Sequence, residues 1–409
     1  MLFRRQFSTS CNRYSNNFTS VLICPGQGKI DSDLFVLPRY EIQQRTQLSA
    51  EIKNILKSVS GLLPDQRILN FFDPKISPHG SLLDIQSINT ISNHPDLKLL
   101  ESTAFVQPLV VLATFLNYFV AHRTFNWSPI DSNYMIGHSL GELTTLALQD
   151  VISLEGAIRI AVQRGRLMED VILNSQKEWG AVAILARDTS LLLKILDKMH
   201  CNIATVNTGQ VVVSGTKSEL KLLLNKLDSF SSNLAENGLS SAKFRKIWLP
   251  ITTPVHHHIF KNLEHELSDI VMDEWASYGS KKLQVPIVCG VNGLVVQKGT
   301  DRVINNWVTG MTRPVRFDLC VQKVYEEHTQ NPQNKSTDSE NKFTDNENNS
   351  VDIQKDKAKA KEGTLDLLNV SGVTYNLCRA ATKGMKNVKC WNFVDDYINT
   401  KSASKNDTI

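Results

Sequence analysis

Residues 134–150, YMIGHSLGELTTLALQD, decide the fold of this 409-residue chain. A short apolar run ends at Gly137, the pattern G-x-S-x-G follows, and a segment with helical apolar spacing comes next. A strand, a sharp turn held by small residues and then a helix is the setting that exposes a serine as a nucleophile. The first amides of that helix would point at Ser139 and stabilise negative charge there. We therefore predict a nucleophilic serine at position 139.

The same alternation of elements occurs elsewhere in the chain. Residues 21–23 form an apolar run that enters the glycine-rich loop PGQG (25–28), and a long helix is expected around residues 102–121. The stretch 106–121 is the most apolar, but it falls short of the roughly 20 residues that span a bilayer. We read it as a buried core helix. Strand, turn and helix in alternation predict an α/β fold with a mostly parallel sheet and no membrane insertion.

Residues 178–248 have a different pattern, which predicts a smaller subdomain. Apolar strand-like runs are each followed by a helical segment, and an alternating segment closes the unit: strands 181–186 and 210–215, helices 190–199 and 217–228, closing segment 244–250. A β-α-β-β-α-β order is typical of a ferredoxin-like fold. We expect it to be inserted into a large α/β catalytic domain formed by residues 20–177 and 249–400.

Two further segments differ in composition from the domains. Residues 1–19 contain Arg4, Arg5 and Arg13 and no acid before Asp31, which is the composition of a mitochondrial presequence and predicts a matrix protein. Residues 328–362 are dominated by polar and charged side chains. They cannot bury enough apolar surface to offset the entropy of ordering, so we expect a disordered insertion.

Charge and cysteine usage exclude several classes. The 45 basic and 41 acidic residues give a net charge of +4 with no basic stripe, so we expect no nucleic-acid partner. The seven cysteines are scattered without metal-ligand spacing, which favours reduced thiols over disulfides or a zinc site. No metal and no cofactor are expected.

A serine hydroxyl needs a base to remove its proton. The candidates are His138, beside the serine, and the cluster His256, His257 and His258 in the proline-bounded segment LPITTPVHHHIF (249–260). His138 shares the turn, so its side chain should point away from the attacking oxygen. Composition alone does not distinguish the three histidines of the cluster.

Five motifs in order resemble one family. They are CPGQG (24–28), GHSLGE (137–142), QRGRLM (163–168), LPITTPVHH (249–257) and RPVRF (313–317). Together they resemble the malonyl-CoA:acyl-carrier-protein transacylases, in a fungal-like form serving mitochondrial type II fatty-acid synthesis. The resemblance covers about residues 20–328 and 364–385, and it implies an α/β-hydrolase-like large domain with the inserted ferredoxin-like subdomain.

The resemblance assigns roles to the catalytic residues. It makes Ser139 the acylated nucleophile and His256 the base, and it gives the oxyanion hole to Gln27 and the backbone amide of Leu140. In this family a backbone carbonyl orients the base, and the matching residue is Arg316.

The resemblance also assigns the substrate pocket. Arg164 matches the arginine that pairs with the malonyl carboxylate, a task for which the guanidinium fork is suited. Gln107 matches a position lining the pocket, and Asn207 matches a turn of the small subdomain. Both could equally be structural.

The implied function is transfer of a malonyl group from malonyl-CoA to the phosphopantetheine thiol of acyl carrier protein through a malonyl-serine. Alternatives are a serine hydrolase or thioesterase, which would not use Arg164, a different acyl donor, and a catalytically silent scaffold. Three departures from the family pattern leave room for altered specificity: Cys24, Lys29-Ile30 and residues 369–372.

Overall fold

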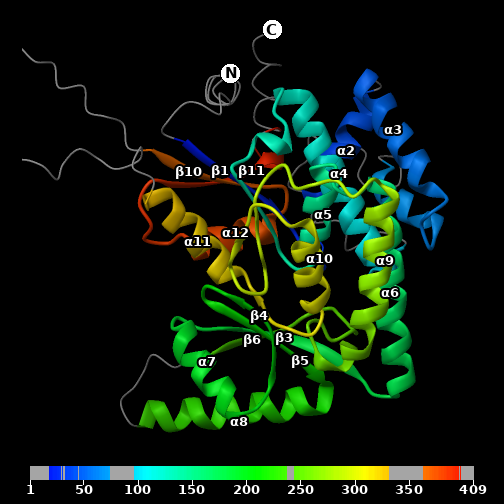
Figure 1. Cartoon of the computed structure of the whole chain (residues 1–409). Helices are drawn as coiled ribbons and strands as arrows, with labels where there is room; N and C mark the ends of the chain where they lie inside the picture. The colour runs from blue at the N-terminus through cyan, green and yellow to red at the C-terminus, as the bar shows by residue number, and fades with distance from the viewer. Residues whose placement is uncertain are drawn as a thin grey trace, which may run out of the picture.

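The computed structural model describes residues 18–28, 30, 33–44, 46–73, 96–236, 244–330, 363–395 and 397, and these form two sheets (Figure 1). The large sheet has the strand order β11-β10-β1-β2-β7-β8. Its strands are β1 (Phe18–Cys24), β2 (Tyr134–Gly137), β7 (Ile287–Val288), β8 (Val295–Val296), β10 (Thr364–Asn369) and β11 (Val388–Asn392). All neighbours pair parallel except β7 and β8. The predicted α/β class with a parallel sheet is confirmed.

The register of the two central strands positions the site. Val21 lies opposite Tyr134, and Cys24 lies opposite Gly137. The carboxyl ends of β1 and β2 therefore coincide at one edge of the sheet. The PGQG loop and the turn that holds Ser139 leave that edge side by side.

Helices cover both faces because the central strands are apolar on both sides. Leu22 faces one core, and its neighbours Val21 and Ile23 face the other, as expected for successive residues of a strand. The first core packs against α2 (Asp33–Gln44), α3 (Gln47–Ser60), α4 (Thr103–Phe125), α5 (Gly141–Leu148), α6 (Leu154–Ser175), α9 (Glu264–Ser277) and α10 (Thr300–Thr309). The second packs against α11 (Phe317–Gln330) and α12 (Gly372–Ala381). Short 3₁₀ helices occur at η1 (Gln66–Phe72), η4 (Leu97–Glu101), η5 (Pro129–Asp131) and η6 (His258–Leu263).

Helix α4 is apolar on all sides, as a helix enclosed by protein must be. Among the described residues it alone is long and apolar enough to cross a membrane, and 89% of its most apolar window is buried. Ser102 caps its first turn by accepting from the Phe105 amide. The predicted core helix is therefore confirmed, and it extends to Phe125.

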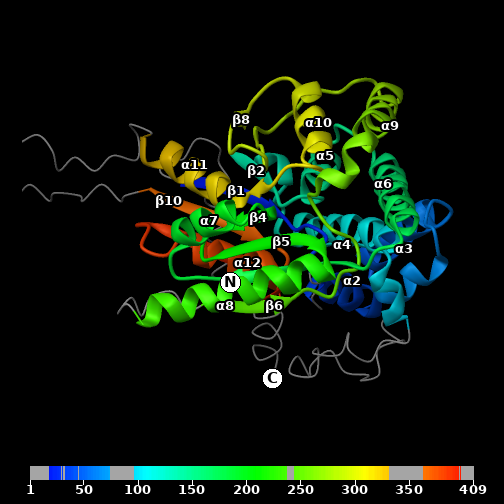
Figure 2. The ribbon, with the colours of Figure 1, turned by 90° about the horizontal axis from the view of Figure 1, so that it is seen from below.

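The small sheet has the order β6-β3-β5-β4-β9. The subdomain built on this sheet contains, in chain order, β3 (Trp179–Leu185), α7 (Thr189–Lys198), β4 (Asn202–Asn207), β5 (Gln210–Thr216), α8 (Lys217–Glu236) and β6 (Arg245–Trp248). Figures 1 and 2 show α7 and α8 on its outer face. The fifth strand, β9 (Val315–Arg316), comes from the large domain and pairs parallel with β4. The two domains thus share a sheet.

Two predicted boundaries need correction. Residues 1–17 and 331–362 lie outside the described residues, so the presequence and most of the polar insertion stay predictions. However, β1 already begins at Phe18, before the predicted boundary. Helix α11 continues to Gln330, because buried His328 is held by a hydrogen bond to Thr19 on β1.

Candidate active site

Ser139 lies in the tight turn between β2 and α5, with a φ of 56°. This left-handed backbone is unfavourable for a residue with a side chain unless the surroundings enforce it. Here the two flanking glycines allow neighbouring backbone to pack closely enough to enforce it. A Cβ at Gly137 would lie 2.0 Å from the Glu142 nitrogen, and one at Gly141 would lie 2.2 Å from the Cys24 oxygen. The glycines of G-x-S-x-G are therefore packing requirements of this turn.

His256 is the histidine that reaches the serine. Its Nε2 lies 2.7 Å from Ser139 Oγ, and its Nδ1 lies 2.6 Å from the carbonyl oxygen of Gly310. A carbonyl can only accept a hydrogen bond, so Nδ1 carries the proton and Nε2 is free to accept from the serine hydroxyl. The network therefore selects the tautomer that a general base requires. His256 also has a left-handed φ, 52°.

The surroundings of His256 keep it neutral. Burial lowers the pKa of the imidazole to about 3, the hydrogen bond to Gly310 opposes this shift, and the charge of Arg164 adds to it. At neutral pH the ring carries no positive charge, so the lone pair of Nε2 is free to accept the hydrogen bond from the serine hydroxyl.

The prediction that the Arg316 carbonyl orients the base is wrong; that carbonyl belongs to Gly310. Arg316 lies in β9, where its amide donates to the Gly290 oxygen at 2.6 Å and its guanidinium pairs with Asp318 at 2.8 Å. Gly310 is the C-cap of α10, where backbone carbonyls lack partners within the helix. The end of a helix supplies the acceptor.

The other histidines lie elsewhere. His138 is turned into the core, with its ring centroid 5.4 Å from that of Phe317. His257 packs edge-on against Trp179 at 5.2 Å and accepts from the Ile259 amide, so it caps η6. His258 is exposed. The structure thus resolves the choice within the histidine cluster in favour of His256.

The predicted oxyanion residues flank Ser139. The Leu140 amide opens α5 and has no hydrogen-bond partner within the described part of the chain. The PGQG loop contacts the same turn, since a Cβ at Gly26 would lie 2.4 Å from the His138 oxygen. The side chain of Gln27 is occupied: its Nε2 donates to Thr103 Oγ1 at 3.0 Å. One N–H of this amide is therefore committed to Thr103, and the backbone N–H of Gln27 is a further donor on the loop beside the turn.

Arg164 is a buried cation on α6, with 5% of its surface exposed. Its Nη1 donates to Gln107 Oε1 at 2.8 Å, and its guanidinium carbon lies 5.4 Å from the ring centroid of Trp307. Its Nε has no partner, and no carboxylate of the described residues pairs with it. Burial lowers the pKa of the guanidinium to about 10, so it remains charged at neutral pH. A buried charge without a counter-charge is costly unless a ligand supplies one.

Close packing of α4 and α6 brings Arg164 and Gln107 together. A Cβ at Gly165 would lie 2.4 Å from the Ala104 Cα, so only glycine permits this approach. Gln107 is fully buried, and its Nε2 contacts Met168 Sδ at 3.5 Å. Its amide oxygen is therefore directed at the guanidinium.

Asn207 ends β4 and donates to Gln210 Oε1 at 3.0 Å in the turn that joins β4 to β5. Its side chain also lies beside His138 and raises the pKa of that imidazole against the larger lowering by burial. Asn207 thus links the small subdomain to the serine turn, and no contact joins it to Arg164.

Sequence reasoning missed two residues of the site. Trp307 donates from Nε1 to the Ser139 carbonyl oxygen at 3.2 Å, and Gly310 follows it on the same helix end. Neither belongs to a recognisable motif. A tryptophan in an amphipathic helix has no sequence signal that separates it from ordinary core.

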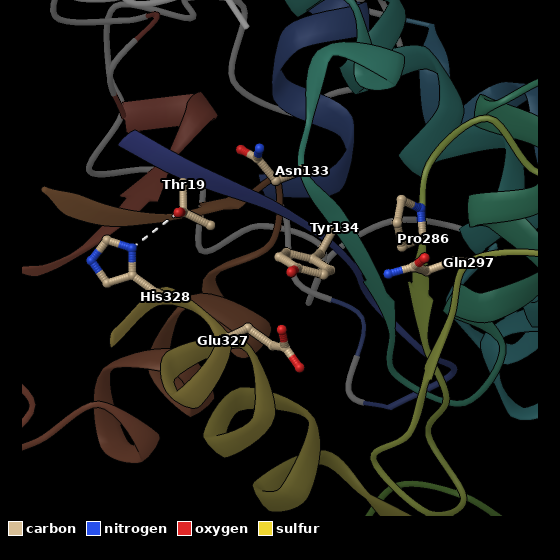
Figure 3. Close-up of a pocket in the computed structure, with 7 residues that line it drawn as sticks. All are labelled: Thr19, Asn133, Tyr134, Pro286, Gln297, Glu327 and His328. Atoms are coloured by element: carbon tan, nitrogen blue, oxygen red, sulfur yellow. Dashed lines mark hydrogen bonds between the residues drawn. The ribbon is translucent and has the colours of Figure 1, made fainter. Parts of the chain in front are cut away.

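A pocket also lies at the opposite edge of the large sheet (Figure 3). It has a volume of about 140 Å³ and is lined by Thr19, Asn133, Tyr134, Pro286, Gln297, Glu327 and His328. Four of these residues stand at the amino ends of β1, β2 and β7, Gln297 follows antiparallel β8 at the same edge, and the other two lie near the end of α11, whereas Ser139 follows a carboxyl end. Ligands of parallel α/β sheets bind outside the carboxyl ends, so we do not assign this pocket to the site.

Two curated proteins with similar sequences share the same name. A malonyl CoA-acyl carrier protein transacylase of Bacillus subtilis (strain 168) is 27% identical over 210 residues, which cover 50% of this chain and 60% of the relative. The protein of the same name from Staphylococcus aureus (strain MRSA252) is 30% identical over 195 residues, which cover 46% of this chain and 57% of the relative. The chain thus spans less than two thirds of the length of these relatives. No protein-family model matches it.

Solved structures agree over nearly the whole chain. The malonyl-CoA:acyl carrier protein transacylase of Helicobacter pylori superposes with a TM-score of 0.63 at 16% identity, covering 94% of this chain and 98% of that one. A malonyl-transacylase in complex with its type II PKS acyl-carrier protein gives a TM-score of 0.60 at 16% identity, covering 91% and 94%. The chain has the fold of the malonyl-CoA:acyl carrier protein transacylases.

Proposed function

We propose that the chain is a serine acyltransferase that moves a malonyl group from malonyl-CoA to the phosphopantetheine thiol of an acyl carrier protein. One observation carries this proposal: Arg164 is a buried cation without a carboxylate partner in the described structure, and Trp307 links it to Ser139. A donor that brings its own carboxylate would supply the missing charge. The names of the relatives support the same substrate pair.

The first half-reaction acylates the serine. Ser139 Oγ gives its proton to His256 Nε2 and attacks the thioester carbon, while the free amide of Leu140 and the backbone of Gln27 stabilise the oxyanion. The carbon–sulfur bond then breaks. The coenzyme A sulfur takes the proton from His256, and a malonyl-serine ester remains.

The second half-reaction reverses these steps. The carrier thiol gives its proton to His256 Nε2, and its sulfur attacks the ester carbonyl. The serine oxygen leaves and recovers the proton, so the malonyl group ends on the carrier. The Gly310 carbonyl holds the imidazole in the required tautomer throughout.

The orientation of the base argues against a hydrolase of the serine–histidine–acid type. In such an enzyme a carboxylate accepts from the histidine, whereas here a neutral carbonyl does. A hydrolase would also gain nothing from a buried arginine.

The test is covalent labelling of the full-length protein with malonyl-CoA, followed by intact mass. We expect one malonyl adduct that disappears in Ser139→Ala and moves to the carrier when holo-acyl carrier protein is added. Release of free malonate faster than transfer would indicate a hydrolase. Absence of an adduct on the parent protein would reject the proposal.

We also propose the mitochondrial matrix as the location, with a role in a fungal-like type II fatty-acid synthesis pathway. The acid-free, arginine-containing leader supports this proposal. Fractionation and protease protection of a C-terminally tagged protein should find it inside mitochondria, and removal of residues 1–17, which leaves β1 intact, should leave it in the cytosol. Cytosolic location of the full-length protein would contradict it.

A further inference from the structure

The end of helix α10 contacts three functional groups at once. Trp307 Nε1 donates to the backbone carbonyl oxygen of Ser139 at 3.2 Å, and its ring centroid lies 5.4 Å from the guanidinium carbon of Arg164. Three residues later, the Gly310 oxygen accepts from His256. The end of this one helix therefore contacts the residue that carries the nucleophile, the base and the arginine.

Trp307 contributes two separable interactions. Its N–H reaches the carbonyl of a serine whose backbone is left-handed, and the Glu142 amide donates to the same oxygen at 3.1 Å. Its ring lies against a guanidinium whose one hydrogen-bond acceptor among the described residues is the amide oxygen of Gln107. Only 4% of Trp307 is exposed, so water does not weaken the cation–π contact.

We propose that Trp307 is a positioning residue that sets the selectivity for carboxylate-bearing acyl donors. Its ring lies against the Arg164 guanidinium and keeps it desolvated, and the Nε of that guanidinium has no partner among the described residues, so the charge is poised to bind the carboxylate of the donor. The inference rests on the proposed acyl transfer and deepens it. The ring acts on selectivity through Arg164, whereas the N–H acts on the acylation of Ser139 with any donor.

Two substitutions separate these roles. Trp307→Phe keeps an aromatic face and removes the N–H, so single-turnover acylation by malonyl-CoA and by acetyl-CoA should fall together by about 2- to 5-fold, the worth of one neutral hydrogen bond. Trp307→Leu removes both, so the malonyl-to-acetyl ratio of kcat/KM should fall by a further factor of about 10 to 30. The loss should appear mainly in KM for malonyl-CoA.

The outcomes are distinguishable. If the parent protein takes up no malonyl label, the proposed function fails before any variant is compared. If the parent is labelled and Trp307→Leu keeps the parental ratio, the inference on Trp307 is overturned. An equal fall for both donors in Trp307→Leu would overturn it too, because general damage to the fold does not discriminate between acyl groups. Trp307→Met fills irregular space and replaces the Leu variant if that variant does not fold.

Discussion

The two edges of the large sheet both carry polar side chains, but these differ in backbone strain and in whether their charges are paired. At the carboxyl edge, Ser139 and His256 have left-handed backbones, and Arg164 is buried with no carboxylate partner in the part of the chain that the structure describes. At the amino edge, polar groups line an open pocket (Figure 3), but Glu327 is ion-paired and His328 is hydrogen-bonded to Thr19. Strained backbone conformations and a buried charge without a counter-charge identify the functional edge better than the presence of a pocket does.

The largest effect that would sharpen this contrast is expected from His256→Ala. Without the base, the serine hydroxyl keeps its proton, and acylation by malonyl-CoA should slow by about 10⁴-fold or more. Rapid-quench measurement of the malonyl adduct gives the rate. The matched control is His258→Ala, an exposed histidine of the same cluster, which should stay within twofold of the parent. Equal losses in both variants would mean that the segment, and not His256, matters.

Arg164→Ala comes next. Removing the guanidinium leaves the donor carboxylate without its partner, so kcat/KM for malonyl-CoA should fall by about 10²–10³-fold while that for acetyl-CoA is spared. Arg166→Ala is the control, since Arg166 is two residues on and exposed. A similar fall for both donors would show that Arg164 supports the fold instead of the substrate.

Much of this architecture could be predicted because local patterns determine it. The turn around Ser139 is fixed by two glycines that no other residue can replace, and the core helix by its all-round apolar surface. The pairing of Ser139 with His256, far apart in sequence, was expected only through the family resemblance. Spacing alone left three histidines equal.

The remainder depends on tertiary contacts with no local signature. The carbonyl that orients His256 was assigned to Arg316, but any carbonyl can accept, and in the fold the carbonyl of Gly310, at the end of α10, accepts from the ring. Trp307 likewise shows its role only when α6, α10 and the serine turn are assembled. The sharing of β9 between the domains is also a tertiary property.

A smaller effect is expected where α4 and α6 pack closely against each other. Gly165→Ala would force a methyl group toward the Ala104 Cα, now 2.4 Å from where the Cβ would stand, and should lower the free energy of unfolding by about 1–3 kcal/mol. Chemical denaturation gives the value. Gly61→Ala is the control, because a Cβ there meets nothing within 4 Å. Equal stability of the two variants would show that α4 and α6 do not approach this closely.

The acid side of the pH profile tests the state of the base. Because burial lowers the pKa of His256 to about 3, the ring stays neutral, and the acylation rate per folded molecule should change by less than about twofold from pH 8 to pH 5. Stability behaves differently. A histidine with a depressed folded pKa stabilises the native state above its unfolded pKa of 6.5, and this contribution declines as the pH falls toward 3. A rate that drops tenfold per pH unit below 6.5 would show that the ring titrates normally.

The smallest effect is expected at the amino edge. Glu327 pairs with Lys323 one helical turn away at 2.7 Å, and both side chains are about one third exposed, so Glu327→Ala should cost only about 0.3–0.5 kcal/mol of stability. Lys323→Ala removes the other half of the pair and should cost the same. Malonyl transfer should remain within twofold in both variants. The pocket beside Glu327 lies at the amino ends of β1 and β2, whereas the Ser139 site lies at their carboxyl ends. A tenfold loss of transfer in Glu327→Ala alone would assign a function to that pocket, and strain and unbalanced charge would then no longer suffice to identify the working edge of the sheet.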